Sequence, residues 1–194
     1  MLKHTHLSSI LNEKAEILSL IQNEETGELA WGKVRKCWAA VDLDLQRNIF
    51  SNIGIGARGA TITLRAEQKL TLHQAIRWRG QFLFLTSIIL TPGRDKKEVK
   101  AALCTPVDCQ ADMDQGDPGI RFPGILTEKY VASDHEQLDP YALLTQNMVL
   151  VVPKAVKLAP GSWVKVGSDT YHVLVPHELD EWKNEYEIQR KADC

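Results

Sequence analysis

The sequence lacks several features that would place it in a large functional class. Of its 194 residues, 23 are Lys or Arg and 25 are Asp or Glu, which gives a formal net charge of −2. This balance gives no support to general nucleic-acid binding, which needs a basic surface. No apolar run approaches the roughly 20 residues that span a bilayer, and the first residues lack the apolar core of a secretory signal peptide. We therefore expect a cytosolic protein with no membrane partner.

Patterns for disulfides, metals and catalysis are missing as well. The four cysteines form no C-x-x-C pair, which favours reduced thiols over disulfides or a zinc site. The six histidines show no spacing typical of a zinc enzyme or a catalytic triad. Neither a nucleophile elbow nor a P-loop is present. The sequence therefore predicts no catalytic residue, no metal and no cofactor.

One short motif is shared with dinucleotide-binding enzymes. Gly54, Gly56 and Gly59 satisfy the pattern G-x-G-x-x-G, which binds a pyrophosphate when a strand leads into the glycines and a helix begins at them. After Gly59, however, Ile62 and Leu64 alternate with polar residues, which is typical of a half-buried strand. No acidic residue lies about 20 positions on, where a ribose ligand is expected. A nucleotide-binding enzyme is therefore kept only as a minor alternative.

Two segments of the chain resemble each other at a constant spacing. Residues 61–78 align without a gap with residues 149–166, so that Ile62 matches Leu150 at an offset of 88 (150 − 62). Each copy is predicted to form a strand, a connection that brings in a leucine, and a hairpin with one apolar face. This recurrence of pattern, length and turn position favours duplication over chance.

The hairpin that follows the aligned segments is expected to differ by one residue in its turn. With this extra residue, Phe82 of the first copy aligns with Tyr171 of the second, and Phe84 aligns with Val173. All four side chains are expected to face the core. The full set of residues expected in the barrel cores is Trp38, Val41, Ile62, Leu64, Leu70, Ile76, Trp78, Phe82, Phe84, Val164, Val166, Tyr171 and Val173.

The overall expectation is a mainly β protein with two small SH3-like β-barrel modules that arose by tandem duplication. The first module is expected over residues 1–104, with Thr26-Gly27 as the turn of its first hairpin. Residues 105–124 are rich in Pro, Gly and Asp and are expected to form a linker. The second module is expected over residues 125–194, shortened at its start.

Six basic residues cluster in sequence near one hairpin of the first module. Such a group can face phosphates, but no aromatic residues for base stacking are interleaved with it. A solvated hairpin end is therefore the favoured interpretation. The residues are Arg77, Arg79, Arg94, Lys96, Lys97 and Lys100.

Several motifs of the first half follow one another in a characteristic order between Ala15 and Cys104. A first strand, a Gly turn and a tryptophan lie in "EILSLIQNEETGELAWGKVRKCWAAVDL", and a strand, "ATITLR", follows a variable loop. The segment "LTLHQAIRWRGQFLFLTSI" and a charged hairpin that ends in "VKAALC" complete the series. In this order the motifs resemble the phage head-tail joining proteins, also called head closure, stopper or head-tail adaptor proteins. Where family members usually stop, this chain continues for 90 residues (194 − 104).

The resemblance implies a non-enzymatic β-barrel connector that forms a ring beneath the portal, joins the head to the tail and helps to retain packaged DNA. The implied partners are the portal or adaptor ring, tail proteins and further copies of the chain, with incidental contact to DNA in the channel. The implied location is the neck of the virion, after synthesis in the bacterial host cytoplasm. A tail completion or terminator protein of the same architecture is the alternative.

Residues 45–59 occupy the place of a long loop in that family. Loops of this length without structure of their own are usually functional or disordered, and a solvated monomer disfavours exposed apolar side chains such as those in this segment. We therefore expect an assembly loop over residues 48–59 that orders against a neighbouring subunit. Its expected interface residues are Asn48, Ile49, Phe50, Ile53, Gly54, Ile55, Gly56, Arg58 and Gly59.

Overall fold

The protein is built from β-strands arranged in two closed barrels. The computed structural model describes residues 11–49, 56–111, 119–128 and 148–191, and within these ranges it contains strands and no helix. The described residues accordingly include no helix that is long and apolar enough to cross a membrane. The prediction of a mainly β chain with two small barrel modules is confirmed.

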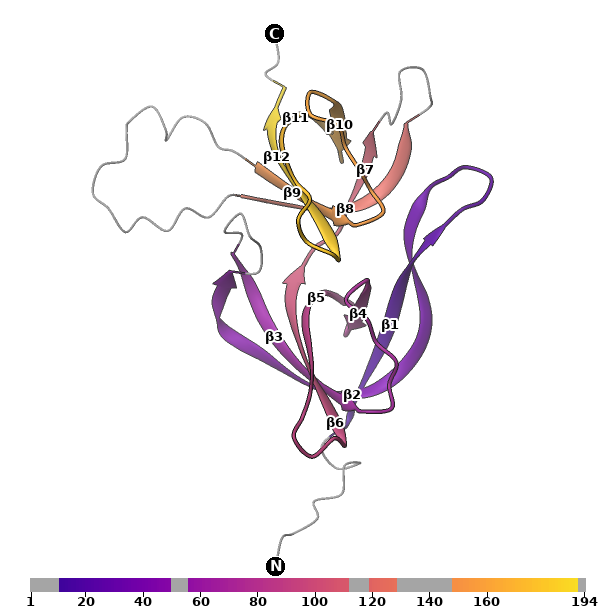
Figure 1. Ribbon diagram of the computed structural model, residues 1–194, viewed down its shortest axis with the longest axis vertical. Helices are drawn as coiled ribbons and strands as arrows, with labels where there is room; N and C mark the ends of the chain where they lie inside the picture. The colour runs from indigo at the N-terminus through magenta and orange to yellow at the C-terminus, as the bar shows by residue number, and fades with distance from the viewer. Residues whose placement is uncertain (1–10, 50–55, 112–118, 129–147, 192–194) are drawn as a thin grey trace, which may run out of the picture. The chain divides into compact units, whose positions relative to one another are not determined.

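The first barrel closes around the alternating apolar residues of the N-terminal half. Its strands are β1 (Glu13–Gln22), β2 (Leu29–Ile49), β3 (Gly56–Arg65), β4 (Gln74–Trp78), β5 (Gln81–Leu90) and β6 (Lys96–Cys104). They follow the order β1-β2-β3-β6-β5-β4 around the barrel, as the ribbon in Figure 1 shows. Strand β4 pairs back onto β1, with Ile17 opposite Ile76, and this pairing closes the sheet without a free edge.

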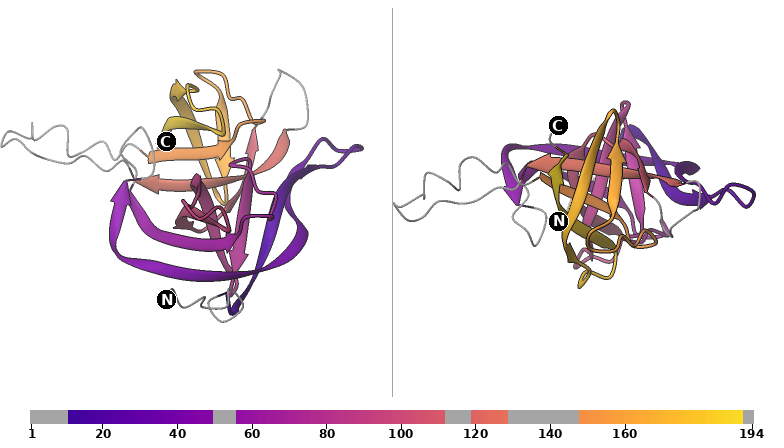
Figure 2. Two further views of the ribbon diagram at one scale, coloured as in Figure 1. Left: turned by 60° about the horizontal axis from the view of Figure 1, so that its bottom comes forward. Right: turned by 90° about the horizontal axis from the view of Figure 1, so that it is seen from above.

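The second barrel repeats this arrangement. Its strands are β7 (Val107–Ala111), β8 (Ile120–Glu128), β9 (Met148–Pro153), β10 (Trp163–Val166), β11 (Asp169–His177) and β12 (Lys183–Arg190). Their order, β7-β8-β9-β12-β11-β10, is that of the first barrel with six added to each strand number, and Figure 2 shows the barrels from two further sides. The second module therefore has all six strands and is not shortened at its start.

The segment expected to be a linker contains strands. Strand β7 and the beginning of β8 fall within residues 105–124, where Cys109 pairs with Phe122 and both side chains enter the second core. Two of the Pro and Gly residues that suggested a linker lie in β8 itself, with Pro123 opposite Asp108 and Gly124 opposite Val107. Burial of one face of the hairpin outweighs the weak strand preference of these residue types.

The sequence offset of 88 corresponds to equivalent positions in the two barrels. Ile62 and Leu150 lie in their respective core clusters, as do Leu70 and Leu158. The register of β5 shifts after Leu85, and that of β11 shifts after Val173, 88 residues later (173 − 85). A bulge is a specific local feature of a strand, so its recurrence extends the repeat beyond apolar alternation.

The expected extra residue in the second hairpin turn is absent. Trp78 pairs with Gln81 and Val166 pairs with Asp169, so each turn has two residues and the offset of 88 continues through it. Tyr171 is consequently equivalent to Leu83 rather than to Phe82.

The inward phase of β5 was therefore mispredicted. Leu83 and Leu85 lie in the first core cluster, whereas Phe82 and Phe84 are buried outside it, on the opposite face of the strand. The ring of Trp31 packs against that of Phe82 with 5.6 Å between their centroids. Since all four residues of the run are apolar, its composition does not reveal which alternate pair faces the core.

Trp38 is a second misassigned core residue. Its side chain is 51% exposed, because β2 turns the neighbouring Cys37 and Ala39 inward and alternation directs Trp38 outward. The ammonium of Lys14 lies 5.5 Å from the centre of its ring. Val41 shares the inward phase and packs, partly buried, against the core.

The other residues expected in the cores line the two barrel interiors. In the first core cluster these are Ile62, Leu64, Leu70, Ile76 and Trp78. In the second they are Val164, Val166, Tyr171 and Val173.

A glycine in the second core leaves no room for a side chain. A Cβ atom at Gly124 would lie 2.8 Å from Sγ of Cys109 and 2.8 Å from Cδ1 of Leu150. We therefore expect Gly124→Ala to lower the free energy of unfolding by about 1–3 kcal/mol through overpacking, as measured by urea titration.

The same clash provides a control for this substitution. Cys109→Ala removes the sulfur atom that the new methyl group would meet, so the double variant is expected to recover part of the loss caused by Gly124→Ala. An unchanged unfolding midpoint for Gly124→Ala alone would contradict the close packing.

Candidate assembly surfaces

Half of the segment expected to form the assembly loop, residues 48–59, belongs to strands. Strand β2 continues to Ile49, so Asn48 and Ile49 belong to it, and β3 begins at Gly56. Gly59 pairs with Ala102 and Arg58 with Leu103, while Nε of Arg58 donates to the carbonyl oxygen of Asp44 at 3.0 Å. The remaining interface candidates, Phe50, Ile53, Gly54 and Ile55, lie outside the described residues.

The glycine motif leads into a strand. Gly56 and Gly59 both belong to β3, whose ladder with β6 runs from Arg58 to Arg65. A pyrophosphate site of the expected kind requires a helix to begin at this position, since its N-terminal amide groups hold the phosphate. The local fold therefore removes the structural basis of the nucleotide-binding alternative.

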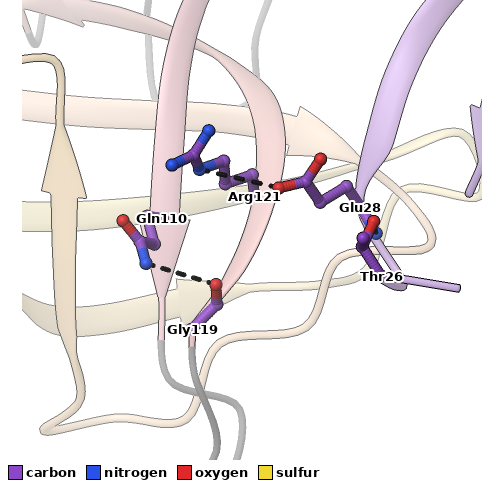
Figure 3. Close-up of polar contacts among 5 residues, drawn as sticks. All are labelled: Thr26, Glu28, Gln110, Gly119 and Arg121. Carbon is purple, nitrogen blue, oxygen red and sulfur yellow. Dashed lines mark hydrogen bonds and ion pairs between the residues drawn. The ribbon is translucent and has the colours of Figure 1, made fainter.

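The tip of the β1–β2 hairpin belongs to the second compact unit of the chain. This segment, Leu20–Ala30, is called the arm below and groups with residues 106–194. Leu29 packs against the second core cluster. At its outer end, Glu28 reaches toward Arg121 of β8, with 3.6 Å between Oε1 and Nε, as Figure 3 shows. The apolar contact of Leu29 is the stronger anchor, because an exposed ion pair contributes little.

The turn of the arm is held by its own hydrogen bonds. Oδ1 of Asn23 accepts from the backbone N–H groups of Glu25 and Thr26 at 2.9 and 3.2 Å. Gly27 adopts φ +72°, a conformation that favours glycine. The turn predicted at Thr26-Gly27 is thus present, and the arm is a preformed element.

Exposed apolar side chains gather at the connection between β5 and β6 and at the equivalent connection of the second barrel. Ile89 is 54% exposed and Leu90 is 47% exposed at the end of β5. Between β11 and β12, Leu179 is 98% exposed. A single exposed apolar residue is ordinary. The adjacent pair Ile89 and Leu90 and the almost fully exposed Leu179 make these two connections candidate contact sites.

Three of the six basic residues near the first-barrel hairpin have a carboxylate partner. Arg77 lies 3.8 Å from Glu16, and Arg79 lies 3.0 Å from Glu13. Lys100 pairs with Glu98 at 3.3 Å. These carboxylates offset the positive charge locally, which agrees with a solvated hairpin end better than with a phosphate site.

Ionisable groups in the described part of the chain show no arrangement typical of catalysis. That part contains no group of three or more His, Cys, Asp or Glu residues placed to bind a metal. The hydrogen bond from Lys33 holds the pKa of Glu16 below its usual range, and burial raises the pKa of the Cys37 thiol. These shifts have structural causes and do not form an acid–base pair.

The sequence interpretation missed the grouping of the arm with the second unit and the exposed apolar side chains of the two hairpin ends. The turn of the arm was predicted at Thr26-Gly27, but no motif in the sequence indicated that Leu20–Ala30 groups with the second unit. Leu179 had a detectable signal in the sequence, because it is a lone apolar residue between acidic neighbours in "HELDE".

Comparisons with known proteins found weak likeness to solved structures and no match of the other kinds. No protein-family model matches the chain, and no curated protein matches it. A solved structure described as "Virion of native gene transfer agent (GTA) particle" contains a chain with 15% sequence identity and a TM-score of 0.38. The match covers 47% of this chain and 92% of that chain. At this TM-score the likeness supports no conclusion about shared fold or function.

Proposed function

We propose that the chain is a non-enzymatic structural connector of a tailed phage or prophage. It joins the portal or head to the tail as a ring and helps to retain packaged DNA. Its partners are the portal or adaptor ring, tail proteins and further copies of itself, and its place is the neck of the virion.

The observation that carries this proposal is the agreement between the motif series and one complete barrel. The motifs that resemble head-tail joining proteins run from Ala15 to Cys104, and the first barrel runs from Glu13 to Cys104. Each motif forms a strand or hairpin of that single closed sheet. A resemblance carried by unrelated fragments would not be expected to begin and end with one closed barrel.

The connection between β2 and β3 remains the proposed assembly loop. Its flanks are fixed by the ladder between β3 and β6 and by the bond from Arg58 to Asp44. Residues 50–55 join these flanks, and they include Phe50 and Ile53, which we propose contact a neighbouring subunit.

The proposal is tested by measuring molecular mass by light scattering, for the protein alone and mixed with its portal ring. We expect either a ring or a monomer that the portal captures at a fixed ratio. A Phe50→Ser/Ile53→Ser variant is expected to reduce ring formation or capture by at least about 10-fold, because it removes two apolar anchors.

The same experiment separates the two connector roles. Capture by tail-tube protein but not by the portal would identify a tail completion or terminator protein instead. A monomer that binds neither would contradict both roles.

A further inference from the structure

The two exposed hairpin ends lie at equivalent places in their barrels and carry opposite charge. We define the basic end as residues 89–97, between β5 and β6, and the acidic end as residues 175–182, between β11 and β12. Both present apolar side chains to solvent, namely Ile89 and Leu90 on the first and Val175 and Leu179 on the second.

The basic end carries a local excess of positive charge. Arg94, Lys96 and Lys97 are opposed there by Asp95 alone, which gives +2 (3 − 1). Across the strand pair, Ile89 is opposite Glu98, whose carboxylate is already paired with Lys100 at 3.3 Å.

The acidic end carries a matching excess of negative charge. Glu178, Asp180 and Glu181 surround Leu179, and residues 175–182 contain no Lys or Arg. The ammonium of Lys154 donates to the carbonyl oxygen of Glu178 at 2.8 Å. Counting Lys154 with the three carboxylates, the local charge is −2 (1 − 3).

The acidic end is held in shape before any partner binds. The hydroxyl of Tyr186 donates to Oε1 of Glu178 at 2.9 Å, and Oδ1 of Asp180 accepts from the N–H of Trp182 at 2.8 Å. These bonds fix the turn on both sides of Leu179. A fixed turn loses little conformational entropy on association.

The basic end is similarly ordered. The N–H of Thr91 donates to the carbonyl oxygen of Lys96 at 3.0 Å, and the N–H of Ala66 donates to that of Asp95 at 3.0 Å. The ammonium of Lys97 donates to the carbonyl oxygen of Gln68 at 2.7 Å. This end is therefore a stable receiving surface rather than a loose loop.

We propose that the acidic end of one copy docks on the basic end of a second copy. Leu179 of the first copy contacts Ile89 and Leu90 of the second. The carboxylates around Leu179 face the cations of the basic end. The partner is a second copy because the chain itself carries both the apolar surfaces and the complementary charges.

A contact of this kind uses two different surfaces and therefore propagates. Each copy that donates its acidic end keeps a basic end for the next copy, which is the property of subunits in rings and filaments. The inference deepens the proposed function, since it identifies a subunit contact for the proposed ring in addition to residues 50–55.

The apolar part of the contact is tested with Leu179→Ser in sedimentation velocity experiments on the full chain. We expect self-association to weaken by about 10- to 100-fold, because the variant removes the buried leucine. Val34→Ser is the matched control, since Val34 is 52% exposed on β2 and belongs to neither end. Equal association of both variants and the unaltered chain would overturn the proposal.

The charged part is tested by reversing one charge on each end. Arg94→Glu and Glu181→Arg are each expected to weaken association by about 10-fold, and more at low salt than at high salt. The double variant restores opposite charges between copies and is expected to return to within about 3-fold of the unaltered chain. Additive weakening in the double variant would contradict the pairing of the two ends.

Cross-linking identifies the occupant directly. A Leu179→Cys variant mixed with an Ile89→Cys variant should give a mixed dimer with a short thiol-specific cross-linker, above the background of the unaltered chain. Absence of that dimer at high protein concentration would overturn the proposal. So would preferential cross-linking of Leu179→Cys to a portal or tail protein, which would assign the acidic end to that partner.

Different results would reject the proposed contact and the proposed connector function. Normal portal capture of Leu179→Ser, without any effect on self-association, would reject the contact and leave the connector role in place. Loss of capture for the unaltered chain would reject the connector role.

Discussion

Replacing Lys183 with Met is expected to lower the free energy of unfolding by about 3–5 kcal/mol. Lys183 and Glu185 lie two positions apart on β12, with 2.6 Å between Nζ and Oε1, and their side chains are only 7% and 2% exposed. The substitution leaves the carboxylate of Glu185 buried without this cation. The cost of taking this carboxylate out of water is then no longer offset by its attraction to the ammonium of Lys183.

Two further variants make this prediction specific to a buried pair. Lys183→Met/Glu185→Leu removes both charges while keeping similar volume, and it is expected to be at least as stable as the unaltered chain. Lys33→Met breaks the surface pair with Glu16, whose partners are 42% and 28% exposed, and is expected to cost less than about 1 kcal/mol. Equal urea midpoints for Lys183→Met and Lys33→Met would show that burial has no special effect.

The Cys109 thiol is expected to react with iodoacetamide at pH 8 at least about 1000-fold more slowly in the folded protein than in denaturant. Burial raises its pKa from 9.0 to about 12, with a smaller contribution from the charge of Asp108. The thiolate is the reactive form, so at pH 8 its population falls by about the factor that separates these two pKa values. Restricted access to the second core slows the reaction further.

Mass spectrometry of labelled peptides checks this rate, with half-buried Cys104 as an internal comparison. The shift also has a consequence for stability. The unfolded chain releases this proton near pH 9 while the folded chain retains it, so stability is lost as the pH rises from 9 toward 12. Similar labelling rates in native and denatured protein would contradict the burial of Cys109.

Much of the fold could be predicted because its information is local. Alternation at Ile62 and Leu64 indicated β3, and the match with Leu150 and Val152 indicated the second barrel at the correct offset. The predictions failed where composition does not fix which side chains of a strand face the core. The run from Phe82 to Leu85 is apolar at every position, so only the two-residue turn before β5 decides which pair faces inward.

Other failures came from residue types with strong average preferences. Trp38 was placed inside because tryptophan is large and apolar, yet the small side chains of Cys37 and Ala39 occupy the inward phase. Pro123 and Gly124 suggested a linker, although burial of Phe122 holds them in β8.

The candidate surfaces were less predictable than the fold. Opposite charge on two hairpin ends is visible in the sequence only after the repeat shows that these ends are equivalent. Acidic neighbours in the sequence indicate that Leu179 is exposed, but the bonds of Glu178 and Asp180 that hold its turn are visible only in the structure.

The arm has a consequence for how the chain can be divided and synthesised. Glu28 and Arg121, which meet in the second unit, are separated by 93 positions (121 − 28). A ribosome therefore completes the arm long before the strands that receive it, and closing so long a loop carries an entropic cost. Cutting the chain after Cys104 leaves Leu29 on the N-terminal piece and the core cluster that it packs against on the C-terminal piece. The boundary between the modules in sequence is thus not the boundary between the two compact units.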